Sequence, residues 1–137
     1  MDGYLLDACA LIAYLNDEDG ADVVDELFEN ASEGDATVFI STINLLEVYY
    51  GMYRELGYEK ATEILSDIQS LPITAISDFS LDAMLEAGRL KAVYKVSLAD
   101  SIALGIASVS GYSLVTADHH EMGPIDTDPD VTLFWIR

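Results

Sequence analysis

The chain has 137 residues, a length typical of one domain, and 51% of them are hydrophobic, so we expect a single domain over residues 1–137 with a substantial core. Its 25 acidic and 6 basic residues give a formal net charge of −19, which argues against the basic surface of an ordinary nucleic-acid-binding protein. No apolar run reaches the roughly 18 residues of a membrane-spanning helix, and the N-terminus lacks the positive flank of a signal peptide. We therefore expect a cytoplasmic protein with no membrane partner.

A single cysteine, Cys9, excludes an internal disulfide, and its apolar surroundings predict a buried structural thiol.

Short apolar strands and helices alternate along the whole chain. The first half predicts a strand at 4–6, a helix at 8–15, a helix between Gly20 and Gly34, a strand at 37–40 and a helix from a cap at Ser41 or Thr42 to Leu56. The second half predicts a helix at 58–70, a strand at 73–76, a helix from a cap at Ser77 or Asp78 to Tyr94, a helix from a cap at Ser97 to Ser110, and strands at 113–116 and 131–135. Because strands that alternate with helices form parallel βαβ units, this pattern predicts a three-layer α/β/α sandwich.

Four acidic residues occupy positions that a parallel sheet would bring together. Asp7 directly follows the first strand, and Asp118 lies two residues after the fourth. Glu47 lies in the helix that leaves the second strand, and Asp100 lies in the first turn of the helix that precedes the fourth. Ligands of open parallel sheets bind outside the carboxyl ends of the strands, so we expect these side chains to share a site.

Each of these acids also has a purely structural interpretation. In chain order, the alternatives are an N-cap at Asp7, a pair of Asn44 with Glu47, a capping box of Ser97 with Asp100, and the cap of a short turn at Asp118. For one acid alone the structural role is the more common one. The four together favour a site, because a carboxylate on a buried helix face is costly unless it is paired or binds a metal.

The helix that carries Asp100 is apolar nearly all round, which predicts that it is buried. Carboxylates that converge without cations repel one another, and a hard divalent ion with a preference for oxygen ligands relieves that repulsion. Asp7, Glu47, Asp100 and Asp118 are therefore candidate ligands for Mg²⁺ or Mn²⁺.

Four segments resemble the motif blocks of the PIN-domain family, in the order in which the family has them. They are LLDACALI at 5–12, STINLLEVYYG at 41–51, VSLADSIAL at 96–104 and LVTAD at 114–118. The small, single-domain form is similar to the VapC-like toxins of toxin–antitoxin pairs. The resemblance implies a sheet of order 3-2-1-4-5, cleavage of RNA with Mg²⁺ or Mn²⁺, and often a homodimer that is bound by an antitoxin.

In such a metal-dependent hydrolase, Asp7, Glu47 and Asp100 would bind the metal, and Asp118 would hold a second ion or an ordered water. Thr116 would orient a carboxylate or a water through its hydroxyl. Two other functions remain open at this point. One is a receiver-like phosphoacceptor domain, which the lack of a lysine after the last strand disfavours. The other is an interaction module that keeps the PIN fold without activity, which the presence of all four acids disfavours.

Three further patterns bear on the habitat and the contacts of the protein. The heavy acidity indicates a halophile, because molar salt shortens the Debye length to about 3 Å and screens the repulsion between this surface and a phosphate chain. The basic residues Arg89, Lys91 and Lys95 either balance a helix C-terminus or contact phosphate beside the site. The tyrosine-rich segment 49–58 forms either core or a dimer face. By contrast, the acidic segment 126–130 is expected to be a turn, since it lacks the glycine and the closing glutamate of a calcium loop.

Overall fold

The computed structural model describes residues 2–137 and has one five-stranded parallel sheet. Its strands are β1 (Asp2–Leu6), β2 (Ala36–Ser41), β3 (Thr74–Ile76), β4 (Ser113–Thr116) and β5 (Leu133–Trp135). They lie in the order β3-β2-β1-β4-β5, which confirms the predicted topology. β5 begins two residues later than the sequence predicts, because the N–H of Val131 closes a turn on the carbonyl of Asp128 at 3.2 Å.

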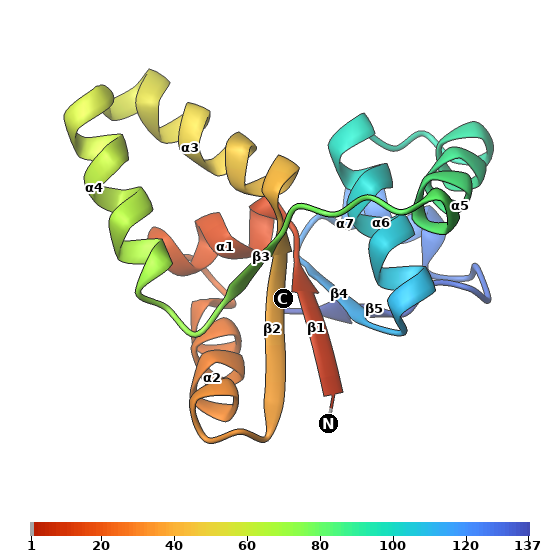
Figure 1. The fold of residues 1–137 in the computed structure, drawn as a ribbon, viewed down its shortest axis with the longest axis horizontal. Helices are drawn as coiled ribbons and strands as arrows, with labels where there is room; N and C mark the ends of the chain where they lie inside the picture. The colour runs from red at the N-terminus through yellow and green to blue at the C-terminus, as the bar shows by residue number, and fades with distance from the viewer. Residues whose placement is uncertain (1) are drawn as a thin grey trace.

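Helices cover both faces of the sheet, so the predicted three-layer sandwich is confirmed (Figure 1). One layer contains α1 (Ala8–Leu15), α2 (Ala21–Ser32), α3 (Thr42–Leu56) and α4 (Tyr58–Gln69). The other contains α5 (Leu81–Val93), α6 (Leu98–Ser110), α7 (His119–Met122) and the 3₁₀ turn Gly123–Ile125. The sequence did not predict α7 or the 3₁₀ turn, which are too short to show a helical period. The pair α3 and α4 extends away from the sheet on the left of Figure 1.

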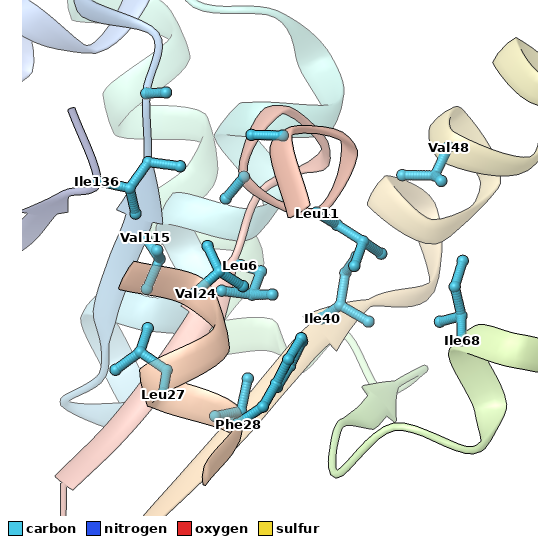
Figure 2. Close-up of a cluster of buried hydrophobic side chains, with 14 residues drawn as sticks. Leu6, Leu11, Val24, Leu27, Phe28, Ile40, Val48, Ile68, Val115 and Ile136 are labelled. Carbon is cyan, nitrogen blue, oxygen red and sulfur yellow. The ribbon is translucent and has the colours of Figure 1, made fainter. Parts of the chain in front are cut away.

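Each strand of the sheet's centre supplies side chains to two separate cores. Leu6 and Val115 pack on the side of α1 and α2, whereas Leu5 and Leu114 pack on the side of α5 and α6. Successive side chains of a strand point to opposite faces, so adjacent leucines enter different cores. Figure 2 shows the first core, where Leu6 lies beside Val24 between the sheet and α2. Because both faces of the sheet are buried, its strands are short apolar runs in the amino-acid sequence.

Side-chain caps begin the helices that carry the candidate residues. The hydroxyl oxygens of Ser41 and Ser97 accept the N–H groups at the third positions of α3 and α6, as expected. The predicted cap of α5 at Ser77 or Asp78 is wrong, since Ser80 caps that helix. The chain needs residues 77–80 to cross from β3 to the opposite layer, so α5 starts later (Figure 1).

The ends of the central strands are joined where the candidate site begins. The N–H of Asp7 donates to the carbonyl of Val115 at 3.1 Å, which ties the exit of β1 to β4. Asp7 and Asp118 therefore both lie at the carboxyl ends of the central strands β1 and β4. Within residues 2–137, none of the helices has the length and apolar character needed to cross a bilayer.

Candidate active site

A hollow of about 370 Å³ lies at the carboxyl ends of the central strands and is lined by carboxylates. We call it the acidic hollow, and its acids are Asp7, Glu18, Glu47, Asp100, Asp118 and Glu121. The structure thus brings together all four acids singled out from the sequence. Among residues 2–137, no lysine, arginine or histidine lines this hollow.

Asp7 is almost fully buried, at 2% exposure, and it serves two roles at once. Its Oδ1 accepts the N–H of Ala10 at 2.8 Å, so it caps α1 as the structural interpretation proposed. Burial raises the pKa of Asp7 to about 6, although hydrogen bonds from Thr116 and Ala10 lower it. Neighbouring negative charges on Asp118 and Glu47 raise it further, so capping and membership of the acidic hollow are compatible.

Thr116 lies between two of the carboxylates, in the last position of β4. Its buried hydroxyl oxygen accepts the N–H of Asp118 at 3.1 Å, and the side chain also hydrogen-bonds Asp7. A hydroxyl that accepts from one group keeps its own proton for another acceptor. Thr116 can therefore donate to Asp7 and fix the orientation of that carboxylate.

Asn44 organises the other side of the acidic hollow, and the sequence indicated it only as a structural partner of Glu47. The residue is fully buried, and its Nδ2 lies 2.9 Å from Oε1 of Glu47 and 3.5 Å from Oδ1 of Asp100. Its Oδ1 accepts the hydroxyl of Ser41 at 2.8 Å, which sets the direction of the amide. Asn44 thus donates to two acids that arrive on different helices, α3 and α6.

Asp100 is the acid whose ionisation is most strongly opposed. Burial is the main cause, and the charges of Asp7, Glu121 and Glu47 add to it, so the pKa of Asp100 rises to about 8. Burial also raises the pKa of Glu47, although the hydrogen bond from Asn44 lowers it. Carboxyl groups with raised pKa values in one hollow indicate that a cation is needed to ionise them together.

The sequence analysis missed two further acids of the hollow, Glu18, which pairs with Arg137, and Glu121. Oδ1 of Asp118 accepts the N–H of Glu121 at 3.0 Å, so Asp118 caps the short helix α7. This cap holds Glu121 where it lines the acidic hollow. The carboxylate of Glu121 accepts the N–H of Ser97 and raises the pKa of Asp100. The spacing Asp-x-x-Glu at 118–121 is a capping-box pattern that could have revealed it.

Arg89 and Lys91 have structural partners, which contradicts the interpretation that they contact phosphate. Arg89 binds Asp128 through two hydrogen bonds of 3.0 Å and Glu86 at 2.5 Å. The guanidinium of Arg89 lowers the pKa of the buried Asp128 to about 2. Lys91 donates to the carbonyl of Val96 at 2.9 Å. Arg89 thus joins α5 to the turn at 126–130, and Lys91 fixes the segment between α5 and α6, as a structural role requires.

Cys9 is less buried than the sequence predicted. It is only half-buried and lines the acidic hollow beside Asp7. Burial and the charge of Asp7 raise the pKa of the Cys9 thiol to about 11, so it stays protonated at neutral pH. Cys9 therefore contributes an uncharged side chain to the lining of the acidic hollow.

The donor set of the acidic hollow fits a hard divalent cation by its chemistry. Carboxylate oxygens dominate it, and Glu18, which pairs with Arg137, is the one acid of the hollow with a salt bridge among residues 2–137. Within residues 2–137, however, no three His, Cys, Asp or Glu side chains already stand close enough together to hold an ion. The fit to a cation therefore rests on the chemistry of the donors and not on a preassembled set of ligands.

The family model of the PIN domain matches residues 4–121, and the chain belongs to this family. A search of the curated proteins finds no significant match. Solved structures share the fold. A chain of VapBC2 from Rickettsia felis, bound to a DNA fragment from the promoter, aligns with a TM-score of 0.75 and 22% identity, over 97% of this chain and 98% of that one.

Two other solved structures extend the likeness to toxins. A toxin–antitoxin complex from Klebsiella pneumoniae aligns with a TM-score of 0.67 and 22% identity, over 94% of this chain and 95% of that one. VapC20 from Mycobacterium tuberculosis, a toxin that cleaves the sarcin–ricin loop, aligns with a TM-score of 0.65 and 14% identity, over 88% and 94%. At these identities the likeness establishes the fold, and the chain is a PIN domain that resembles VapC toxins.

Proposed function

We propose that this protein is a divalent-metal-dependent endoribonuclease and the toxin of a toxin–antitoxin pair. The observation that carries the proposal is the convergence of Asp7, Glu47, Asp100 and Asp118 on one hollow at the carboxyl ends of the strands. The raised pKa values of Asp7, Glu47 and Asp100 make this hollow a site for positive charge. The likeness to VapC20 supports RNA as the substrate.

In this proposal Asp7, Glu47 and Asp100 hold Mg²⁺ or Mn²⁺, and Asp118 holds a second ion or an ordered water. Such an ion, when bound, stabilises the charge that develops on the phosphoryl group and makes water more acidic. The hydroxyl of Thr116 keeps Asp7 oriented, and the amide of Asn44 keeps Glu47 and Asp100 in reach of each other.

The reaction itself is hydrolysis of a phosphodiester bond. A bond forms between the oxygen of water and phosphorus, the bond from phosphorus to one ribose oxygen breaks, and the water loses a proton while the leaving oxygen gains one. In this proposal Asp118 orients the attacking water, because it lines the hollow and its Oδ1 is fixed by the N–H of Glu121. Fixed acceptors of this kind raise the rate by positioning the reactants.

Incubation of end-labelled single-stranded RNA with the protein tests the proposal, with Mn²⁺ or Mg²⁺ and with excess chelator. Cleavage that requires the ion is the expected result. Stable phosphorylation by acetyl phosphate, without cleavage, would instead support the receiver-like function. A protein that neither cuts RNA nor binds Mn²⁺ would be the silent interaction module.

An antitoxin and a second copy of the chain are the partners that we propose. Two exposed apolar surfaces could receive them: α3 presents Leu46, Tyr50 and Tyr53, and the start of α5 presents Leu81 and Leu85. The exposure of most of the tyrosine-rich segment rules out core packing as its main role. Exposed apolar clusters of this kind mark interaction surfaces. Light scattering on the purified chain should give twice the 14.9 kDa monomer mass if the homodimer forms.

A further inference from the structure

We propose that Lys95 and His120 form a phosphate subsite beside the acidic hollow. The subsite would bind a backbone phosphate next to the one that is cleaved, on the same RNA strand. This inference rests on the proposed function and adds to it two residues that bind the RNA backbone.

The first observation is a second hollow that adjoins the acidic one. It measures about 370 Å³ and is lined by Lys95, Asp118, His120, Glu121 and Pro124. Asp118 and Glu121 line both hollows, so they form the wall between them. An RNA strand that places one phosphate in the acidic hollow and crosses this wall meets Lys95 and His120.

The second observation is that the other basic side chains are already engaged. Their contacts are Arg54 over the ring of Tyr50 at 5.3 Å, Lys60 with Glu63 at 3.6 Å, Arg89 with Glu86 and Asp128, Lys91 with the carbonyl of Val96, and Arg137 with Glu18 at 3.3 Å. Lys95 is the one basic residue for which residues 2–137 show no such contact, and its side chain is exposed. In a chain of net charge −19, it is the cation best placed to meet a phosphate at this site.

The third observation is that the segment carrying Lys95 is braced on both sides. Lys91 binds the carbonyl of the buried Val96, and the N–H of Ser97 donates to Glu121 on α7. Lys95 therefore projects from a fixed backbone. A fixed attachment reduces the conformational entropy that is lost when a lysine side chain contacts a ligand.

The chemistry of the two side chains suits a phosphate. Lysine supplies a compact charge with three donors, and an imidazole supplies a ring N–H. Asp118 and Glu121 weaken this subsite when the acidic hollow holds no cation, because they repel phosphate at short range. The affinity of Lys95 for the RNA phosphate should therefore increase when Mn²⁺ is added.

The test compares Lys95→Ala with Lys60→Ala, which removes the same charge from an exposed position on α4. Cleavage of a short oligoribonucleotide is measured in Mn²⁺ for both variants and the wild type. Lys95→Ala should lower kcat/KM about tenfold, the size expected for a charge-assisted hydrogen bond. Lys60→Ala should stay within about twofold of the wild type. Equal rates for the two variants would overturn the inference and leave the proposed nuclease intact.

Neutral methylphosphonate linkages locate the contact on the substrate. One linkage at a time is neutralised along the oligoribonucleotide, and the wild type should slow at one position beside the cleaved bond. Lys95→Ala should lose that sensitivity, because the partner of that phosphate has gone. A variant that keeps the full sensitivity would contradict the contact.

A binding measurement separates this inference from the proposed function. Fluorescence anisotropy of a labelled RNA is recorded with Asp7→Asn alone and combined with Lys95→Ala or with Lys60→Ala, in Mn²⁺. If the wild type never cuts RNA, the proposed function fails, and this measurement still decides the subsite. Weaker binding only in the Lys95→Ala combination supports it, and equal affinities overturn it.

Discussion

The amide nitrogen of Asn44 lies 3.5 Å from Oδ1 of Asp100, although the two residues come from helices in different layers of the fold. The same nitrogen lies 2.9 Å from Oε1 of Glu47. Asn44 is thus a neutral donor between two carboxylates that would otherwise repel each other. It joins the two helix layers at the point where the proposed metal binds.

Replacement of Asn44 by alanine should therefore damage both stability and metal binding. The change removes the N–H donor that Glu47 and Asp100 share and the acceptor of the Ser41 O–H, and an unsatisfied buried group costs about 1–3 kcal/mol. We expect a fall of that size in the free energy of unfolding by urea, and weaker Mn²⁺ binding by calorimetry. Asn30→Ala, on α2 away from the acidic hollow, is the control. Unchanged Mn²⁺ affinity in Asn44→Ala would show that Asn44 acts on the fold alone.

The metal-free protein should lose stability as the pH rises. The pKa values of Asp7 and Asp100 rise to about 6 and about 8 on folding, so the folded state keeps protons that the unfolded state releases near pH 4. Their stabilisation is complete below about pH 4 and is lost as the pH passes the raised values.

Asp7→Asn should remove part of this pH dependence, because asparagine also caps a helix but carries no charge. At pH 8 the variant should be more stable than the wild type, by at most about 3 kcal/mol for a shift of about two pKa units. Urea unfolding between pH 4 and pH 8 measures it, with the exposed Asp25→Asn as the control for surface charge. Parallel pH curves for Asp7→Asn and the wild type would contradict the raised pKa of Asp7.

Mn²⁺ should stabilise the folded protein through the acidic hollow. An ion that binds only the folded state adds about 2.7 kcal/mol at a hundredfold excess over its Kd. Thermal unfolding with and without Mn²⁺ should show this increase in the wild type and in Glu26→Gln, which alters an exposed acid of α2. Glu47→Gln should lose most of it. A shift of equal size in Glu47→Gln would make Glu47 a structural residue.

The fold could be predicted from the sequence because local patterns determine most of it. The apolar strands, the glycines at 20, 34 and 57 and the serine caps are short-range signals, and the structure confirms the elements they predict. The two errors have different causes. The start of α5 depends on long-range geometry, the length of chain needed to cross the sheet. Helix α7 has a local cap at Asp118 but is too short to show a helical period.

The candidate site could be predicted only in part, for the same reason. Asp7 directly follows β1 and Asp118 lies two residues after β4, so the topology fixes their position. The role of Asn44 depends on the approach of α3 to α6, which no local pattern encodes. Glu86 lies three residues before Arg89 and is a local signal, but the buried partner Asp128 lies 39 residues away, so the sequence could not show that second pairing.

Cleavage of RNA should increase as salt rises from dilute buffer toward molar KCl. An ordinary nucleic-acid-binding protein loses affinity with salt, because binding releases cations from the phosphates. Here a net charge of −19 repels the substrate, and salt screens that repulsion and keeps the acidic fold compact. Circular dichroism at each salt concentration separates folding from activity. A cleavage rate that is highest in dilute buffer would show that a basic surface, for example on a partner chain, binds the RNA.

The most direct test of the central claim is single-turnover cleavage of labelled RNA in molar KCl with Mn²⁺, by the wild type, Asp7→Asn, Asp100→Asn and the control Asp25→Asn. The account predicts rapid cleavage by the wild type and the control, none with excess chelator, and a loss of at least about a thousandfold in the two site variants, which stay folded. Cleavage that survives the chelator, or that proceeds at the wild-type rate in Asp100→Asn, would contradict a metal-dependent nuclease built on these carboxylates.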